Sequence, residues 1–207
     1  MSDLDRHTHW EEVYAAKKET EVSWYEPTPR VSLDLIRQSG VPKEAEIIDI
    51  GGGASHLVDD LLSDGYRAVT VLDLSEKALA MVRGRLGSRA SQVRWIAADV
   101  TSWKPSQRYD LWHDRAAFHF LTEAEDRRAY VDRLTRAVAP GGQVIIGTFA
   151  PDGPDKCSGL PVIRYDADSL QTALGSRFEL EQTLPYDHPT PWGGLQRFQF
   201  SHFRKLT

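Results

Sequence analysis

The sequence predicts an α/β protein with a doubly wound, mostly parallel sheet of seven strands, one of them antiparallel and supplied by a C-terminal hairpin. Two observations lead to this fold class. From residue 47 to residue 149, short apolar runs alternate with longer amphipathic stretches, which is the pattern of repeated strand–helix–strand units. After Ala150 the alternation stops, and two runs flank a segment rich in proline and glycine. Such a pair of runs predicts a hairpin that closes the sheet.

The parallel strands are predicted from apolar runs that end at glycine or at an acidic residue. The first run stops at the glycines 51–53, and the next two stop at Asp73 and Asp99. The segment 140–142, Pro-Gly-Gly, predicts a turn into the fifth strand. The seven expected strands are 47–50, 68–72, 93–97, 109–113, 143–149, 178–184 and 195–203.

The helices between these strands are predicted from amphipathic spacing and from residues that favour helix starts. Pro29 suits a first helical position, and Ser55 and Ser75 suit N-caps. Thr122 and Glu125 have the spacing of a capping box. The expected helices are 6–18, 29–38, 55–64, 75–86, 122–138 and 168–174.

Length and composition limit the possible functions. The 207 residues, 41% hydrophobic and 27% charged, fit one globular domain. We divide it into an N-terminal segment 1–40, a core 41–150 and a C-terminal segment 151–207. The net charge of −5 argues against a nucleic-acid partner, which needs a basic face. Cys157 is the single cysteine, so no internal disulfide is expected and a reducing cytoplasm is permitted. Neither a secretory leader nor a membrane span is predicted.

The turn after the first strand is the candidate ligand site, because open parallel sheets bind ligands where the strand order reverses. Gly51 and Gly53 let the backbone approach a ligand closely. Asp73, 22 residues after Gly51, can accept hydrogen bonds from both ribose hydroxyls. Asp99 is placed to accept from an adenine amino group. His56 stands where a dinucleotide fingerprint needs glycine, so a nicotinamide oxidoreductase is the least favoured hypothesis. The residues therefore predict an adenosyl site.

With these features the chain resembles class I S-adenosylmethionine-dependent methyltransferases, whose fold is Rossmann-like. The matching segments lie within residues 46–150 and are, in order, IIDIGGGAS, VTVLDLS, AADV, YDLWHDRAAFHFL and APGGQVIIGTF. The family's glycine motif usually has a third glycine, where this chain has Ser55. The resemblance implies S-adenosylmethionine as cofactor and S-adenosylhomocysteine as product.

The resemblance also implies roles for single residues. Gly51 and Gly53 would lie under the methionine part of the cofactor, and Asp73 would hold the ribose. Asp49 would order the glycine turn or contact the methionine end through water. The remaining cofactor-binding candidates are Leu74, Asp99, Val100, Asp114 and the aromatic residues Trp10, Tyr14 and Trp24.

The N-terminal aromatic residues carry a second resemblance. The pattern Trp10-x-x-x-Tyr14, followed by Ser23-Trp24-Tyr25, is similar to the aromatic lid of the thiopurine and tellurite methyltransferase branch. In that branch, aromatic residues before the first strand cover the cofactor. We therefore expect residues 1–27 to become ordered over bound cofactor.

Candidates for the methyl-acceptor site come from the loop after the fourth strand and from the tip of the hairpin. His119 is the predicted proton acceptor and His188 the alternative, although either can be a buried structural histidine. Asp114 and Arg115 either pair with each other, or Arg115 binds an anionic acceptor. Cys157 is interpreted as incidental, since methyl transfer needs no covalent enzyme intermediate. The candidate substrate-binding residues are Arg115, Phe118, His119, His188 and Trp192.

The leading functional hypothesis is a small-molecule methyltransferase that works mainly by aligning its acceptor and excluding water. A protein-lysine methyltransferase and a non-catalytic S-adenosylmethionine-binding protein are the alternatives. Metal is not expected, because the His and Cys residues lack the spacing of metal ligands. We expect no membrane partner, a cytoplasmic location, and a monomer or weak homo-oligomer.

Overall fold

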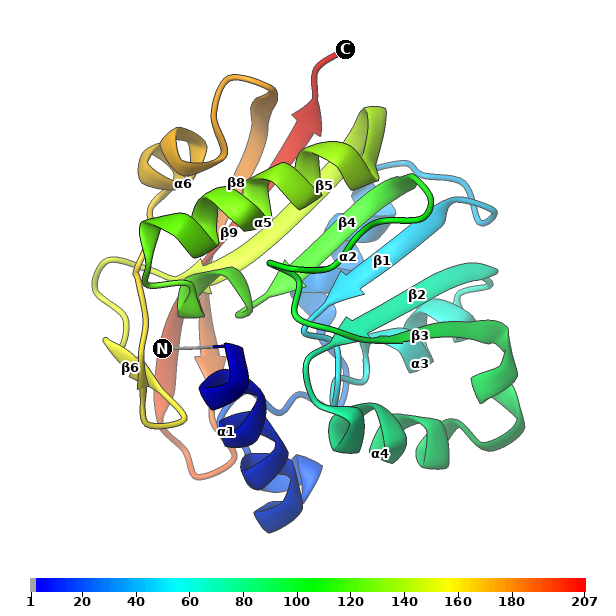
Figure 1. Ribbon diagram of the computed structural model, residues 1–207, viewed down its shortest axis with the longest axis vertical. Coiled ribbons are helices and arrows are strands. Elements are labelled where there is room, and N and C mark those ends of the chain that lie inside the picture. The colour runs from blue at the N-terminus through cyan, green and yellow to red at the C-terminus, as the bar shows by residue number, and fades with distance from the viewer. Residues whose placement is uncertain (1–2) are drawn as a thin grey trace.

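The computed structural model describes the backbone of residues 3–207 and the side chains from residue 5 onward. Seven strands form one sheet in the order β3-β2-β1-β4-β5-β9-β8 (Figure 1). β9 runs antiparallel to both of its neighbours, and the other neighbouring strands are parallel. The predicted fold class is confirmed. The strands of this sheet are β1 (Glu46–Ile50), β2 (Ala68–Asp73), β3 (Val93–Ala97), β4 (Tyr109–Arg115), β5 (Val138–Phe149), β8 (Phe178–Pro189) and β9 (Leu195–Lys205).

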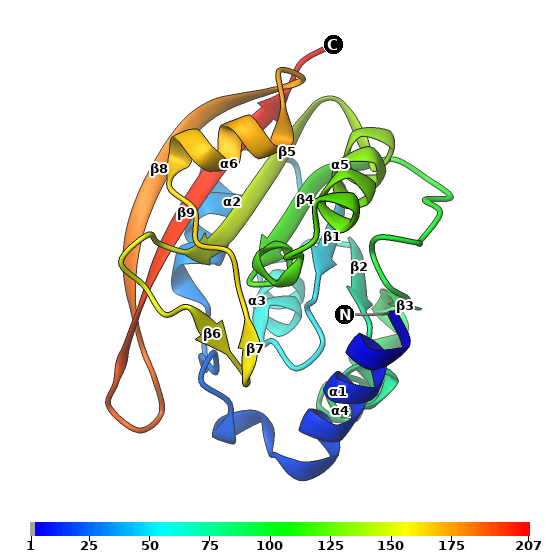
Figure 2. The ribbon, with the colours of Figure 1, turned by 60° about the vertical axis from the view of Figure 1, so that its left-hand side comes forward.

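Helices cover both faces of the sheet and bury one apolar core on each (Figures 1 and 2). The first core lies under α2 (Arg30–Gln38), α3 (Leu57–Ser63) and α4 (Glu76–Leu86). The second lies under α5 (Ala124–Ala137) and α6 (Ala167–Leu174). Successive residues of each parallel strand point alternately into one core and into the other. Both faces of these strands are therefore buried, and their residues are mostly apolar.

The N-terminal helix α1 (Asp3–Ala16) lies outside these layers. It packs along α4, beyond the carboxyl ends of the first three strands (Figure 2). The strand order reverses between β1 and β4, where Asp49 pairs with His113 and Ile50 with Asp114. The end of α1 and this reversal point therefore lie on the same edge of the sheet.

Helix starts differ from the predictions by one to three residues. Ser75 caps α4 as predicted, its hydroxyl accepting from the Ala78 N–H. Pro29 is the N-cap of α2 rather than its first residue. The Ser55 hydroxyl accepts from the Leu57 N–H, but the cap position of α3 is His56. The predicted capping box at Thr122 does not form, because α5 begins at Ala124 after Glu123, and no side chain caps it.

The C-terminal part is more extensively paired than predicted. β5 begins at Val138 and includes the predicted turn 140–142, because β4 continues to pair with it across an irregular register. β8 and β9 extend to Pro189 and Lys205, so the hairpin is longer than expected. The sequence also did not predict a short hairpin with strands of two residues each, or three short 3-10 helices. These are β6 (Lys156–Cys157) with β7 (Leu160–Pro161), and η1 (Glu19–Glu21), η2 (Gly87–Gln92) and η3 (Phe118–Phe120).

Candidate active site

The turn after β1 brings backbone close to two neighbouring segments. Gly51 has a φ of +66°, and a Cβ there would lie 2.9 Å from the Cβ of Ala117. A Cβ on Gly53 would lie 2.5 Å from Asp73 Oδ2 and 2.6 Å from the Cβ of Ala78. Glycine is therefore required at both positions, by conformation at the first and by space at the second. The turn places the backbone of Gly51 beside a cavity that Asp73 and Asp99 also line.

Asp73, at the end of β2, is held by the backbone on both sides. Its Oδ2 accepts from the Gly53 N–H and its Oδ1 from the Ser75 N–H, each at 2.8 Å. The residue is 6% exposed, and burial raises the pKa of Asp73 to about 6 in spite of these hydrogen bonds. Each carboxylate oxygen keeps a second lone pair, so the group can still accept from a bound diol.

Asp99 is engaged by a residue that the sequence did not single out. Its Oδ1 accepts from the N–H and the hydroxyl of Thr101, and its Oδ2 lies 3.0 Å from the Arg6 guanidinium. Arg6 comes from α1 and also pairs with Asp126 on α5. The acid predicted for the adenine end is thus the place where α1 is fastened to the sheet. In the sequence, only the family resemblance indicated that residues of α1 take part in the site. It indicated the aromatic residues Trp10 and Tyr14, and not Arg6.

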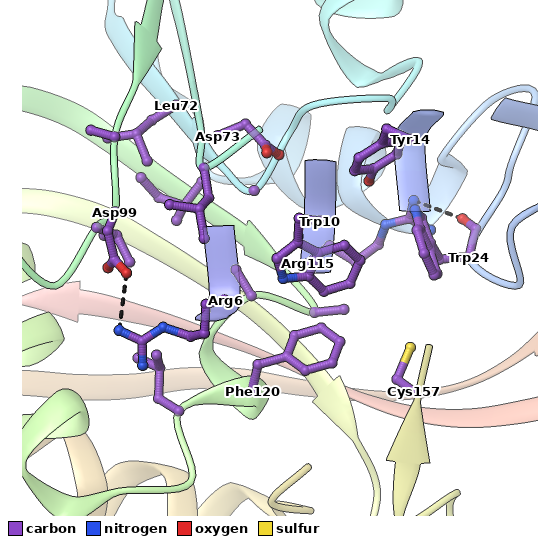
Figure 3. Close-up of a pocket in the computed structure, with 18 residues that line it drawn as sticks. Arg6, Trp10, Tyr14, Trp24, Leu72, Asp73, Asp99, Arg115, Phe120 and Cys157 are labelled. Carbon is purple, nitrogen blue, oxygen red and sulfur yellow. Dashed lines mark hydrogen bonds and ion pairs between the residues drawn. The ribbon is translucent and has the colours of Figure 1, made fainter. Parts of the chain in front are cut away.

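The aromatic residues of the N-terminal segment gather over the cavity (Figure 3). The Trp10 ring packs edge-on against Trp24, 5.7 Å between centroids, and against Phe120 at 5.1 Å. The Tyr14 ring packs edge-on against Trp24 at 6.4 Å, and burial raises the pKa of Tyr14. Tyr25 points elsewhere and packs against His56. Sequence-distant aromatic rings therefore form a roof above the glycine turn.

The cavity under this roof has a volume of about 120 Å³. Asp99 and Arg6 lie at one end of it and Cys157 at the other (Figure 3). Most of its wall is apolar. The lining residues are Arg6, Trp10, Tyr14, Trp24, Ile50, Gly51, Leu72, Asp73, Leu74, Ala98, Asp99, Val100, Arg115, Ala116, Ala117, Phe120, Leu121 and Cys157.

A smaller cavity of about 20 Å³ lies against the same turn. It shares Trp24, Gly51 and Arg115 with the larger one. Its other lining residues are Asp49, Gly52, Ala54, Ser55 and His113. The two cavities therefore meet where the glycine turn faces Arg115.

Arg115 is held by the N-terminal segment. Its guanidinium lies 3.1 Å from Glu26 Oε2 and donates to the Trp24 carbonyl at 3.0 Å. Glu26 also accepts from the Tyr186 hydroxyl, and His188 Nδ1 lies 2.9 Å from Glu26 Oε1. Burial raises the pKa of Glu26, but the contacts with His188 and Arg115 outweigh it, so the pKa lies below its usual value. The sequence did not single out Glu26, which joins β4 to the tip of the hairpin.

Of the two alternatives for Asp114 and Arg115, pairing with each other does not occur. Neighbouring strand residues point to opposite faces, so the two side chains diverge. Asp114 accepts from the Tyr130 hydroxyl at 2.7 Å and from the N–H groups of Ala117 and Phe118. It is fully buried, and burial raises the pKa of Asp114 to about 6. Asp114 therefore shapes the loop after β4 and lines neither cavity.

The structure does not bring the predicted proton acceptors to the cavity. His119 is 0% exposed, packs against Phe120 and Phe149, and both of its ring nitrogens lack a hydrogen-bond partner. Burial lowers the pKa of His119 to about 3. His188 is also buried, with Nε2 lying 2.7 Å from the Ser23 carbonyl and Nδ1 against Glu26, so both ring nitrogens are engaged by other residues and His188 lines neither cavity.

Two further acceptor-site expectations are also wrong in placement. Phe118 is 0% exposed and belongs to the core under α5 and α6. Trp192, at the tip of the hairpin, is 65% exposed and lines neither cavity. Cys157, interpreted as incidental, does line the cavity, and burial raises the pKa of its thiol to about 11. The small hairpin β6–β7, which the sequence did not reveal, is what brings it there.

The residues present fit S-adenosylmethionine. The glycine turn has no room for side chains, a buried carboxylate stands at the end of β2, and Leu74 and Val100 line an apolar slot beside Asp99. In an open α/β sheet this edge, at the reversal of strand order, is where nucleosides bind. Fold and site together are similar to those of the class I S-adenosylmethionine-dependent methyltransferases.

Comparison with known proteins agrees with that class. Residues 47–142 match the family described as "Methyltransferase domain". The matched residues include the glycine turn, Asp73 and Asp99. It is 28% identical over 96 residues to Nodulation protein S of Rhizobium fredii, covering 46% of this chain and 54% of that protein. It is 26% identical over 170 residues to trans-aconitate 2-methyltransferase of Sinorhizobium medicae, covering 81% and 61%. The chain thus spans about half the length of Nodulation protein S.

Solved structures share the fold over nearly the whole chain. One is the structure titled "Conversion of a Disulfide Bond into a Thioacetal Group during Echinomycin Biosynthesis". Its TM-score is 0.78 at 22% identity, with 97% of this chain and 93% of that chain covered. Another is the N-methyltransferase NodS from Bradyrhizobium japonicum with S-adenosyl-L-homocysteine. Its TM-score is 0.74 at 17% identity, with 96% and 98% covered. At these identities the likeness concerns the fold.

The described residues hold neither a membrane-spanning helix nor a cluster of metal-ligating side chains. Between residues 3 and 207, no helix combines the length and the apolar character needed to cross a bilayer. Over the same residues, no three or more His, Cys, Asp or Glu side chains gather as a metal site.

Proposed function

We propose that the chain is an enzyme that transfers the methyl group of S-adenosylmethionine to a compact acceptor molecule. The observation that carries the proposal is the roofed cavity, which continues past the glycine turn to Arg115 and Cys157. The adenosyl candidates occupy one end of it. The space at the other end, between Trp24 and Cys157, is where the acceptor would bind.

When bound, S-adenosylmethionine supplies a methyl group on a positively charged sulfur. The chain then has to hold an acceptor atom in line with that methyl group and keep water away. Trp10, Tyr14 and Trp24 exclude water, and Arg115 is fixed by Glu26 at the junction of the two cavities. The positions of His119 and His188 do not support a proton-acceptor role. Alignment and desolvation are therefore the proposed catalysis, and the favoured acceptor atom is one that loses its proton easily.

A protein-lysine methyltransferase is the second candidate. It is favoured by a relative, the "eEF1A lysine and N-terminal methyltransferase" of mouse, 25% identical over 139 residues that make up 66% of this chain and 19% of that protein. A protein substrate needs an open groove for its peptide. The α1 roof over the cavity argues for the compact acceptor instead.

The test is formation of S-adenosylhomocysteine from S-adenosylmethionine, with cell extract divided into a low-molecular-mass fraction and a protein fraction. We expect turnover with the low-mass fraction and none with the protein fraction. Turnover with the protein fraction alone would favour the lysine methyltransferase. Binding without turnover on either fraction would favour the non-catalytic binding protein. The Asp73→Asn variant is the control for turnover that does not come from this site.

The proposal places the enzyme in the cytoplasm, as a monomer or weak homo-oligomer without a nucleic-acid partner. The net charge of −5 supports the last point, and the single buried thiol of Cys157 is compatible with a reducing compartment. Light scattering of the purified chain, alone and mixed with duplex DNA, tests the oligomeric state and the absence of nucleic-acid binding together.

A further inference from the structure

A chain of three buried polar side chains runs beneath the glycine turn. His113 Nδ1 lies 2.6 Å from Asp49 Oδ1, and His113 Nε2 lies 2.9 Å from the Ser32 hydroxyl. The three residues are 2%, 2% and 1% exposed, respectively for His113, Asp49 and Ser32. They come from β4, β1 and α2, which meet on the face of the sheet that α2 covers.

With a neutral His113, one arrangement satisfies every donor and acceptor of this chain. An ionised Asp49 only accepts, so His113 Nδ1 carries the proton and donates to it. His113 Nε2 then presents a lone pair, and the Ser32 hydroxyl donates to that lone pair. Ser32 thereby selects the tautomer that suits Asp49. The histidine in turn fixes the rotation of the carboxylate.

Packing alone does not account for these residues. The side chains around His113 on the same face of the sheet include Leu111, Ile47 and Ile145, which are fully buried and apolar. An apolar residue at position 113 would match them without the desolvation cost of a buried polar group. The order serine–histidine–carboxylate also occurs in hydrolases, but Ser32 lines neither cavity and cannot reach a substrate.

The surroundings of the second carboxylate oxygen of Asp49 indicate a function for this hydrogen-bonded chain. Asp49 Oδ2 lies so close to Gly52 that a Cβ there would collide with it. Asp49 lines the smaller cavity together with Gly51, and Arg115 lines the same cavity. The cavity thus has one carboxylate and one guanidinium in its wall. Those charges complement the ammonium and carboxylate of an amino acid.

We propose that His113 and Ser32 are positioning residues that hold the carboxylate of Asp49 toward the aminoacyl end of S-adenosylmethionine. The inference rests on the proposed function, since it needs that cofactor at the glycine turn. Neither residue touches the cofactor in this scheme. Both act through the orientation of Asp49.

The experiment compares two ligands that differ only in the aminoacyl end. Calorimetry measures the affinity of the chain for S-adenosylhomocysteine and for 5′-methylthioadenosine, which lacks the amino acid. In His113→Leu we expect S-adenosylhomocysteine to bind about 10-fold more weakly, because a hydrogen bond to a charged group is lost. Affinity for 5′-methylthioadenosine should stay unchanged.

Two further variants separate positioning from simple structural damage. An asparagine amide can donate from nearly the place of histidine Nδ1, so His113→Asn should recover most of the lost affinity. Ser32→Ala leaves His113 in place and should give a smaller loss, about 3-fold, again for S-adenosylhomocysteine only. These two variants also test the inference if His113→Leu does not fold.

The outcomes are distinct. Equal losses for both ligands would overturn the inference, because they would mean a general disturbance of the site. Unchanged affinity for S-adenosylhomocysteine in Ser32→Ala and His113→Asn, with no loss in a folded His113→Leu, would overturn it as well. Failure of the unmodified chain to bind either ligand would instead remove the proposed function itself, and the inference with it.

Discussion

The two ends of the cavity are built in different ways. The adenosyl end comes from three consecutive strands and their turns, where Gly51, Asp73 and Asp99 follow strand ends at regular intervals. The acceptor end is assembled from segments that are far apart in the chain, including Trp24, Arg115 and Cys157. At the first end Asp73 is held by backbone N–H groups of the adjoining turns, and the Arg6–Asp99 ion pair adds one long-range contact. The second end depends on long-range contacts such as that of Arg115 with Trp24. The difference implies that substitutions at the adenosyl end change cofactor affinity, whereas those at the acceptor end change packing and acceptor choice.

The largest expected effect tests the adenosyl end. Asp73→Ala removes a carboxylate that would accept from both ribose hydroxyls, each hydrogen bond being worth about 1.5–3 kcal/mol. We expect S-adenosylhomocysteine to bind at least about 100-fold more weakly, measured by calorimetry. Unchanged affinity would show that Asp73 does not hold the ribose.

The same carboxylate makes cofactor binding depend on pH. The pKa of Asp73 is raised to about 6 by burial, so the group takes up a proton as pH falls through 6. Ribose hydroxyls then lose a charged acceptor, and the affinity for S-adenosylhomocysteine should fall between pH 7 and pH 5. Asp73→Asn has no such proton and should bind weakly and without this pH dependence, which is measured on the same calorimeter.

The packing of His119 behind the acceptor end can be tested through the pH dependence of folding stability. The pKa of His119 is lowered by burial from 6.5 to about 3, so the unfolded chain binds a proton there first as pH falls. The folded state should therefore lose about 2 kcal/mol of stability between pH 7 and pH 5. The His119→Phe variant should lose less free energy of unfolding over that pH interval, as measured by urea unfolding. Identical pH dependence in the two proteins would show that the ring has a partner in solution.

His119→Phe also sharpens the comparison of the two ends. If His119 only packs, kcat on the true acceptor should change by less than about 10-fold, below the usual contribution of a general base. A loss of about 100-fold or more would restore His119 as the proton acceptor.

The lid contact at the adenosyl end gives a smaller effect. Arg6→Ala leaves Asp99 and Asp126 without the guanidinium that links α1 to them, and we expect about 5-fold weaker binding of S-adenosylhomocysteine. In the unmodified chain, amide exchange in α1 should slow when that ligand binds. The variant should lose most of the slowing, and Arg6→Lys should keep part of it. Exchange that is equal with and without ligand in the unmodified chain would argue against a lid.

The smallest effect is expected at the hairpin tip. Trp192 is 65% exposed and outside both cavities, so Trp192→Ala should leave the acceptor KM and cofactor affinity within about 2-fold. A clear rise in KM for the acceptor alone would bring the tip back to the acceptor site, as the sequence first suggested. Steady-state kinetics with both substrates measures the two effects separately.

The sequence predicted what depends on local pattern. Strand order along the chain, the cap at Ser75 and the positions of Gly51 and Asp73 all follow from short stretches of residues. The acceptor end does not. At the adenosyl end, the contact of Arg6 with Asp99 spans 93 positions and was likewise not predicted. At the acceptor end, Arg115 meets Trp24 across 91 positions and His188 meets Ser23 across 165.

Those contacts need the register of β8 with β9 and the path of residues 17–29, and neither has a local signal. The hairpin tip shows the same limit. Its proline residues predict a loop with restricted conformation, but they do not determine the direction in which the loop projects. In the structure Trp192 points to solvent. Buried histidines such as His119 and His113 look alike in the sequence, although one lies among apolar rings and the other joins two hydrogen-bond partners.

The position of α1 has a consequence for the catalytic cycle as a whole. One helix supplies Arg6 at the adenine end and Tyr14 near the acceptor end, so it covers both compartments at once. If ligands enter and leave beneath α1, neither the spent product nor the methylated acceptor could leave before α1 lifts. The number of turnovers per second would be limited by how often that helix lifts, however fast the methyl group moves. Solvent viscosity would slow such an enzyme, and a rate independent of viscosity would place the slow step in the chemistry.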